Sequence, residues 1–167
     1  MKEIFERRSC RKFDDRKIEA GKIEKLLRAG MAAPTAGNQR EWEFIVVTHR
    51  ELLAKLAAAS PYSACAAGAP LAIVLLGNTE DKRFPQCWQQ DLGACAENIL
   101  LEAVHLGLGG VWLGIAPEED RMKNVREIFD LPEEVKPFAI LPLGYPKEVP
   151  TPDERWDPDK VSYNGYR

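Results

Sequence analysis

The order of helical and extended patterns along the sequence predicts an α/β domain with a doubly wound parallel sheet. Three observations support this expectation. Helical and strand-like segments alternate from residue 19 onward. Residues 71–76 are all apolar, which is typical of a central strand that is covered on both faces. Residues 86–106 have a wide apolar face, which suits a core helix or a subunit interface better than a surface helix.

The N-terminal part of the chain carries two helical patterns, a loop and a strand. Residues 2–8 predict a short helix, and residues 19–32 predict a longer one because apolar side chains recur there at helical spacing. The longer helix should end before Pro34, since the residue before a proline disfavours the helical conformation. Residues 33–39 are rich in turn-forming side chains and predict a loop, and residues 42–48 predict a strand.

The middle of the chain alternates between helix and strand. Residues 50–59 are rich in Ala and Leu and predict a helix, and residues 62–68 predict a further short one. The apolar strand over residues 71–76 comes next. The long helix over residues 86–106 should end at Gly107, because glycine readily adopts the left-handed conformation that closes a helix.

Two strands and one helix precede a tail of different composition. Strands are predicted over residues 111–115 and 138–145, and a helix opens at residues 117–120 with acids in its first turn. The tail, residues 146–167, holds four prolines that prevent a long helix, so we expect one domain over residues 1–167 that ends in an extended arm. Such an arm needs a surface for its rings, and a second subunit would supply it. The rings belong to Trp156, Tyr163 and Tyr166.

The composition is that of a soluble globular protein, with 45% apolar and 29% charged residues. Lys and Arg number 23 against 26 Asp and Glu, and this balance argues against a nucleic-acid partner. No Cys-x-x-Cys pair occurs and only two His are present, so the spacing of a metal site is absent. The longest apolar run is too short to cross a membrane and the N-terminus has no apolar leader, so we expect a cytoplasmic protein.

The sequence lacks the motifs of a self-sufficient catalyst. Neither a Walker loop nor a Gly-x-Gly-x-x-Gly turn occurs, and neither His49 nor His105 has an obvious nucleophilic partner. Cys10 lies among arginines, which can lower the pKa of a thiol, but we expect it to be a packing residue. A protein without nucleophile, base or metal that still binds a phosphate would leave the chemistry to a cofactor.

A pattern that suits anion binding stands near the N-terminus. Residues 7–11, Arg-Arg-Ser-Cys-Arg, place three guanidinium groups and one hydroxyl within five positions. Guanidinium forks bind phosphate oxygens in a bidentate way, and the Ser hydroxyl adds a donor. Residues 1–28 hold ten Lys or Arg against six Asp or Glu, a local surplus that could serve one small anionic ligand. The alternative is a solvated basic turn, which is what a charge run usually forms.

Four motifs in chain order resemble those of the nitroreductase family. Residues 7–13 resemble the family's Arg-Arg-Ser-x-Arg-x-Phe opening, and residues 34–44 resemble its Pro-Ser-x-x-Asn-x-Gln-Pro-Trp-x-Phe segment. Residues 91–115 resemble its long central helix and the strand that follows, and residues 144–146 with Arg155 resemble its C-terminal end. The resemblance covers nearly the whole chain, and the ordered set is far more specific than any one motif.

The resemblance implies a different fold from the doubly wound sheet. Proteins of this family have an α+β fold, in which a mixed, mostly antiparallel central sheet is wrapped by helices. It also implies an intertwined homodimer with two FMN sites at the subunit interface and with the C-terminal arms exchanged between subunits. We adopt this expectation because the bulky rings of the tail already require a second surface.

The resemblance assigns residues to the phosphate and to the pyrimidine edge of the flavin by matched position. Arg7, Ser9 and Arg155 would hold the FMN phosphate, and Arg8 would join them or line the ribityl chain. Arg11 would lie near the pyrimidine edge, where a cation stabilises the negative charge that develops at N1 and O2 on reduction.

A second group of residues would approach the flavin ring. Leu113 and Gly114 would reach it from a strand end, where glycine permits close backbone contact, although plain turn geometry also explains such a glycine. Where the family has Gln-Pro before the Trp, this chain has Arg40-Glu41, so Gln39 or Arg40 would supply the polar contact. The residues expected from the partner subunit are Pro34, Thr35, Ala36 and Asn38.

The implied activity is hydride transfer from NAD(P)H to flavin N5 and then to a nitroaromatic, quinone or similar electron-poor acceptor by a ping-pong route. No protein side chain needs to be covalently involved. One alternative is a non-catalytic flavin-binding module, and another is the same scaffold with different flavin chemistry, such as reductive dehalogenation or flavin fragmentation. A pocket that selects flat rings by stacking discriminates weakly, so the sequence identifies neither the acceptor nor the preferred nucleotide.

Overall fold

The two longest strands, β2 (Leu71–Asn78) and β5 (Val135–Gly144), pair antiparallel in the middle of one sheet. The computed structural model describes residues 1–166 and places β1 (Trp42–Val47) antiparallel to β2 on one side. The prediction of a central strand after residue 70 is therefore confirmed, and this strand extends two residues further than predicted.

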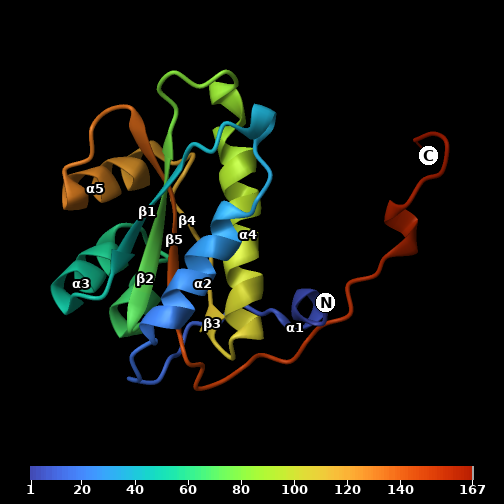
Figure 1. The fold of residues 1–167 in the computed structure, drawn as a ribbon. Helices are drawn as coiled ribbons and strands as arrows, with labels where there is room; N and C mark the ends of the chain where they lie inside the picture. Colours follow the sequence, from blue (N-terminus) through green and yellow to red (C-terminus); the bar gives the residue numbers. More distant parts are fainter. Residues whose placement is uncertain (167) are drawn as a thin grey trace.

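The other side of β5 carries two short strands in place of the single strand predicted over residues 111–115. β3 (Gly109–Gly110) and β4 (Leu113–Gly114) each pair antiparallel with β5, and the two residues between them interrupt the ladder. The strand order is β1-β2-β5-β3, with β4 also beside β5 (Figure 1).

The five strands pair antiparallel, so the prediction of a doubly wound parallel sheet is wrong. An isolated parallel bridge between Ser9 and Gly110 makes the pairing mixed, and the α+β fold implied by the resemblance is confirmed. The alternation of helix and strand did not reveal strand direction. The connection between β1 and β2 consists of helix α3 (Arg50–Ala58) and the turn η2 (Ala64–Gly68), which pack against each other, and β2 runs antiparallel to β1.

Helices cover both faces of this sheet (Figure 1). α2 (Ala20–Met31) and α4 (Trp88–His105) lie on one face, and α3 and α5 (Glu119–Phe129) lie on the other. Alternate residues of β2 enter the two layers, since Ile73 belongs to the core under α4 and Val74 to the core under α3 and α5. A strand buried on both faces needs an apolar residue at every position, which explains its sequence.

The remaining helical elements are short. α1 (Glu3–Glu6) lies inside the predicted N-terminal helix, and the long helix begins later than predicted because η3 (Pro85–Cys87) forms a 3-10 turn there. No helix within residues 1–166 is long and apolar enough to cross a membrane. The other 3-10 turns are η1 (Ala36–Asn38) and η4 (Pro158–Lys160).

Helix α4 ends at the predicted glycine. Gly107 has φ +72°, a left-handed conformation that costs glycine little. The Gly107 N–H donates to the carbonyl of Val104 at 3.0 Å, and the Leu108 N–H donates to that of Ala103 at 2.8 Å. This pair of bonds is the Schellman arrangement, which satisfies carbonyls that the helix end would otherwise leave free.

The segment that follows α1 runs along β3 and then meets the exit of β5. The Cys10 N–H donates to the Gly110 carbonyl at 2.9 Å, and the Asp14 N–H donates to the Tyr145 carbonyl at 2.9 Å. These bonds hold residues 10–14 against the sheet at the point where the arm begins.

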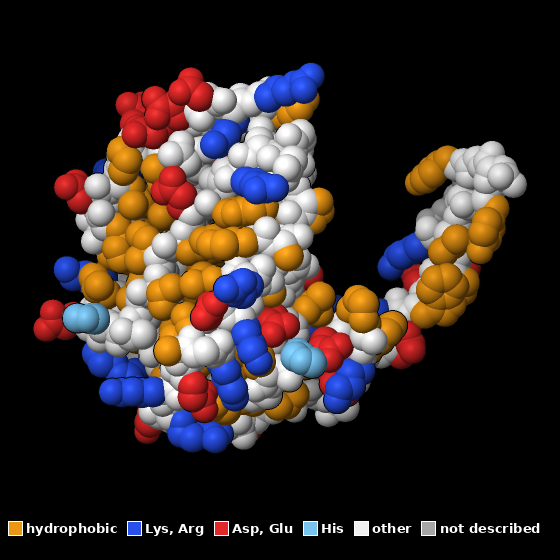
Figure 2. Space-filling view, in the orientation of Figure 1, with side chains coloured by type: hydrophobic (Ala, Val, Ile, Leu, Met, Phe, Trp, Pro, Cys, Tyr) orange, Lys and Arg blue, Asp and Glu red, His pale blue; other side chains and the backbone are white. Residues whose placement is uncertain are grey.

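The arm beyond β5 first crosses beneath the N-terminal segment and then stands away from the body (Figure 1). Figure 2 shows hydrophobic side chains along this free part, where Trp156 is 70%, Tyr163 84% and Tyr166 94% exposed. Rings this exposed bury almost no apolar surface within one chain, so the folding of a single chain does not explain them.

Candidate functional site

A cleft between α1 and the arm brings together arginines from the two ends of the chain. It has a volume of about 610 Å³, and Arg7, Arg8 and Arg155 all line it. Asp153 and Glu154 are also in the lining, so guanidinium groups outnumber carboxylates. The other lining residues are Ile4, Phe5, Pro152 and Trp156.

The three arginines of the cleft are held in different ways. Arg7 Nε lies 3.3 Å from Glu97 Oε1 of α4, and no other residue in the described range 1–166 forms an ion pair or hydrogen bond with the Arg7 guanidinium group. Arg8 donates from Nε and Nη2 to two backbone carbonyls of the arm at 3.3 and 3.4 Å, and so ties the arm to the N-terminal segment. Arg155 is exposed. Guanidinium groups that line one cleft suit a phosphate, because they offer several charge-assisted donors to its oxygens.

Ser9 and Arg11 continue along the same segment beyond the cleft. The Ser9 backbone pairs with Gly110 of β3, and the residue is half-buried. Arg11 is exposed and lies near Cys65, where burial raises the pKa of the thiol and the Arg11 charge opposes that rise. The structure therefore places Arg7, Arg8, Ser9 and Arg11 along one N-terminal segment, whereas Arg155 reaches the cleft from the arm.

Cys10 is buried, at 3% exposure, in a small apolar cluster with Phe13 and Ala69. Burial raises the pKa of its thiol above the ordinary value. The expectation of a packing residue is confirmed, and the idea that neighbouring arginines lower this pKa is wrong. Because alternate side chains of an extended segment point to opposite sides, Cys10 faces the core while its neighbours face outward.

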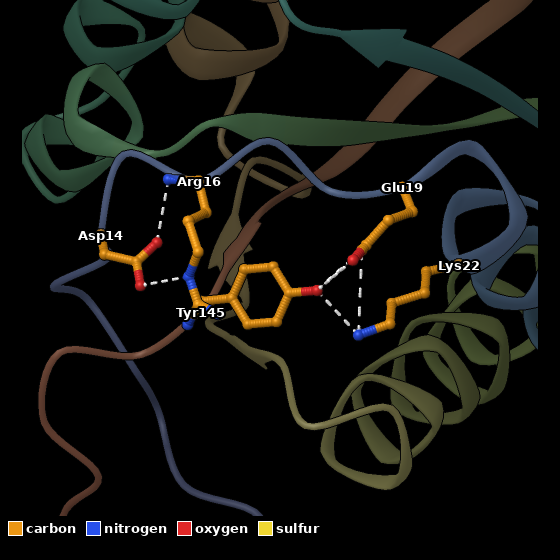
Figure 3. Close-up of polar contacts among 5 residues, drawn as sticks. All are labelled: Asp14, Arg16, Glu19, Lys22 and Tyr145. Carbon is orange, nitrogen blue, oxygen red and sulfur yellow. Dashed lines mark hydrogen bonds and ion pairs between the residues drawn. The ribbon is translucent and has the colours of Figure 1, made fainter.

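A polar cluster anchors the place where the N-terminal segment meets the arm (Figure 3). The Tyr145 hydroxyl donates to the Glu19 carboxylate at 2.7 Å and accepts a hydrogen bond from Lys22 Nζ at 2.8 Å. The Arg16 guanidinium lies 3.8 Å from the centre of the Tyr145 ring, and its Nε donates to Asp14 at 2.8 Å. Sequence reasoning missed this cluster, since Tyr145 is distant in sequence from its four partners.

A loop was predicted over residues 33–39, and residues 34–39 form a loop at the N-terminal end of α4 (Figure 1). The Ala36 N–H donates to Asp91 Oδ2 at 2.9 Å. The Gln39 side chain donates to Asp91 Oδ2 at 3.2 Å and to the Phe84 carbonyl at 3.1 Å, and it accepts from the Phe84 N–H at 3.0 Å. Gln39 therefore shapes the loop within its own chain, a role that the sequence did not reveal, and its contact with a cofactor stays a prediction.

The outer part of this loop carries the other predicted residues. Pro34 and Asn38 are exposed, whereas Thr35 is half-buried and its hydroxyl accepts the Arg40 N–H at 3.1 Å. Asn38 and Arg40 both have positive φ, and the Asn38 side chain accepts from Arg40 Nε at 3.0 Å. The loop thus engages the Arg40 backbone N–H and Nε, and the two Nη groups of the guanidinium can still bind another group.

Behind the loop lies a pair of buried carboxyl groups that sequence reasoning did not pair. Glu41 is 1% and Asp91 is 7% exposed, and both accept hydrogen bonds from the Gln39 amide nitrogen, at 3.0 and 3.2 Å. Burial raises the pKa of Glu41, and the neighbouring Asp91 raises it further. The sequence did carry one signal for this pair, because Glu41 occupies the position at which the family motif has proline.

Leu113 and Gly114 form β4 next to an open part of the surface. Leu113 is buried, while no atom within residues 1–166 lies within 4 Å of the position that a Cβ on Gly114 would take. The backbone here can therefore be approached closely. Trp112 stands beside them at 37% exposure, and its ring packs edge-on against Phe138 with centroids 5.4 Å apart.

Within one chain, these groups form separate surfaces. The loop at residues 34–39 bonds to Asp91 in the first turn of α4, whereas the N-terminal segment pairs with Glu97 and His105 further along the helix. No hydrogen bond or ion pair among residues 1–166 joins this loop to the arginine cleft. Within the same part of the chain, no cluster of His, Cys, Asp and Glu could hold a metal ion.

The model of the nitroreductase family matches residues 4–64 and 60–145. The chain belongs to the nitroreductase family. The matched ranges include Arg7, Arg8, the loop at residues 34–39 and β4, but they end before the arm. In this family member, the assignment of Arg155 to the site therefore rests on its position in the lining of the cleft and not on the family match.

Several proteins are similar to this member of the nitroreductase family over nearly its whole length. A protein of Methanothermobacter thermautotrophicus, described as a candidate NADH dehydrogenase/NAD(P)H nitroreductase, is 43% identical over 161 residues, or 96% of this chain and 84% of that one. The structure of a candidate NADH oxidase from Clostridium acetobutylicum has a TM-score of 0.96 at 47% identity and covers 98% of this chain and 99% of that one. An FMN-dependent nitroreductase from Clostridium difficile R20291 has a TM-score of 0.92 at 31% identity, with 98% of each chain covered.

Proposed function

We propose that the protein is an FMN-dependent oxidoreductase that passes a hydride from NAD(P)H to a nitroaromatic, quinone or similar electron-poor acceptor in a ping-pong sequence. The family membership and the names of the similar proteins support an NAD(P)H-linked flavin enzyme. The observation that carries the proposal is the cleft in which Arg7, Arg8 and Arg155 meet, because it gathers the donors that a phosphorylated cofactor needs.

The residues of the cleft fit the phosphate end of FMN. A phosphate dianion accepts several N–H bonds at once, and guanidinium forks provide them in fixed geometry. Arg7 and Arg155 would hold the phosphate, Arg8 would hold the arm in place beside it, and the Ser9 hydroxyl would add a further donor. The surplus of guanidinium groups over carboxylates in the lining favours an anion there.

The ring of FMN would lie beside β4, where the backbone is open at Gly114, next to Leu113. When bound, FMN supplies the redox chemistry, because its N5 accepts a hydride and the reduced ring passes the electrons to an acceptor. Arg11 would stabilise the negative charge that reduction places on the pyrimidine edge. Gly114 would allow close approach of the backbone, and no side chain of this protein forms a covalent bond in the reaction.

The active form is a homodimer in which the loop at residues 34–39 of each subunit completes the site of the other. Two observations support this arrangement. The loop and the arginine cleft have no polar contact within residues 1–166 of one chain. The rings of Trp156, Tyr163 and Tyr166 are exposed in the single chain and would gain a partner surface. Analytical ultracentrifugation of the wild type and of Trp156→Ala tests the dimer, which the variant should weaken.

The function is tested by adding FMN to the purified protein, removing free flavin and recording the visible spectrum. We expect a yellow protein that NADH or NADPH bleaches under anaerobic conditions and that a quinone restores. A protein that stays colourless with added FMN contradicts the proposal. Bound FMN that neither nucleotide reduces would indicate a non-catalytic flavin module, and reduced flavin that quinones and nitroaromatics fail to reoxidise would indicate other flavin chemistry.

A further inference from the structure

The buried carboxyl groups of Glu41 and Asp91 stand at the base of the loop at residues 34–39, where several bonds of the loop end. Asp91 Oδ2 accepts both the Ala36 N–H and the Gln39 side-chain amide. Glu41 precedes β1, and its Oε1 lies 3.0 Å from the same amide nitrogen, whose two hydrogens are shared among this oxygen, Asp91 Oδ2 and the Phe84 carbonyl. The conformation of the loop therefore depends on the charge of these two carboxyl groups.

The hydrogen bonds around Glu41 and Asp91 are best satisfied when the two carboxyl groups together carry one proton. Glu41 Oε2 is buried, and within residues 1–166 it has no hydrogen-bond donor. As an ionised oxygen it would be a buried acceptor without a partner, beside a second carboxylate, which is costly in a dry site. As a protonated oxygen it can donate to a carboxylate, and the neighbouring Asp91 carboxylate shares the Gln39 amide nitrogen with Glu41. Asp91 already accepts two N–H bonds and so suits the charged role.

We propose that Glu41 and Asp91 share one proton and act as a clasp that holds the loop at residues 34–39 in the shape that completes the flavin site. The part that concerns flavin rests on the proposed function, whereas the part that concerns folding does not. Gln39 extends the clasp to the next segment through its paired bonds with Phe84. When the proton leaves, two negative charges face one amide, and the loop loses the arrangement that joins it to α4.

The direction of the pH effect follows from proton binding. Burial, and then Asp91, raise the pKa of Glu41 above its ordinary value of 4.5, so the folded protein keeps a proton that the unfolded chain has lost. The stability that the clasp contributes is present at low pH and is lost as pH rises through the raised pKa. The other charged side chains of the surrounding segments lie wholly or partly at the surface: Arg40, Glu43, Glu80, Asp81, Lys82, Arg83 and Lys136.

The first test measures thermal unfolding of the flavin-free protein between about pH 5 and 9. Glu41→Gln keeps the shape of the side chain, can donate to Asp91 and has no charge at any pH. The wild type should lose stability with rising pH in a range where Glu41→Gln does not. Glu43→Gln is the matched control, because Glu43 is on the same part of the chain but exposed, and it should keep the wild-type slope. Equal slopes for wild type and Glu41→Gln overturn the clasp.

The second test measures the dissociation constant of FMN by flavin fluorescence over the same pH range. The ratio of the wild-type constant to that of Glu41→Gln should rise by up to about tenfold per pH unit where Glu41 loses its proton. This ratio cancels the titration of the FMN phosphate, which both proteins share. A ratio that stays constant across the range contradicts the clasp.

Asp91→Asn provides an independent check if Glu41→Gln folds poorly. Removing the negative neighbour should let Glu41 ionise more easily, so the loss of stability should move to lower pH than in the wild type. An unmoved profile overturns the shared proton. A wild type that binds no FMN at any pH counts against the proposed function alone, because the flavin-free unfolding profile still decides the clasp.

Discussion

Replacing Arg155 with Ala should weaken FMN binding and leave riboflavin binding unchanged. Arg155 lines the cleft together with Arg7 and Arg8, and riboflavin differs from FMN by lacking the phosphate. A hydrogen bond to a charged group contributes about 1.5–3 kcal/mol. Because Arg155 is exposed, the lower value applies, and about 1.5 kcal/mol corresponds to roughly a tenfold rise in the dissociation constant of FMN. Arg155→Lys keeps the charge but loses the fork, so its effect should be smaller.

The assay is a fluorescence titration of both flavins at one salt concentration, since exposed charges are screened by salt. Lys160→Ala is the matched control, because Lys160 lies on the same arm, pairs with Asp157 at 3.1 Å and is absent from the lining of the cleft. It removes the same charge and should leave FMN binding near the wild-type value. The reasoning is refuted if Arg155→Ala weakens riboflavin as much as FMN, or if FMN binding does not change.

Three further predictions concern the frame around the site. Gly107→Ala should lower the free energy of unfolding by about 1–2 kcal/mol because φ is +72° there, whereas Gly21→Ala in α2 should be neutral or stabilising in the same urea titration. Tyr145→Phe removes the hydrogen bond that lowers the pKa of Glu19. The stability that this bond contributes is present above the ordinary pKa of 4.5 and is lost in acid, so the difference in unfolding free energy between variant and wild type should shrink as pH falls. A difference that stays constant with pH would contradict the reasoning. Burial raises the pKa of the Cys95 thiol to about 12, so mass spectrometry should find Cys95 unlabelled by a thiol reagent in the native protein and labelled after unfolding.

Much of the local structure followed from patterns that act over a few residues. Because every residue of 71–76 is apolar, the sequence predicted a strand that is covered on both faces, and Gly107 predicted the end of the long helix. These features depend on backbone conformation and on side-chain periodicity, which neighbouring residues decide. The arginines at positions 7, 8 and 155 were also recognised in the sequence, through the resemblance of ordered motifs.

Strand direction and the polar partners needed the tertiary structure. Whether β2 runs antiparallel or parallel to β1 depends on the path of the connection between them through space, which no local pattern encodes. The pairing of Glu41 with Asp91 is similar, because fifty residues separate two carboxyl groups that become neighbours when α4 packs on the sheet to which β1 belongs. Local sequence thus determined which elements form, whereas burial against distant elements determined which charges meet, since the pKa of a carboxyl group departs from its ordinary value only in the surroundings that folding creates.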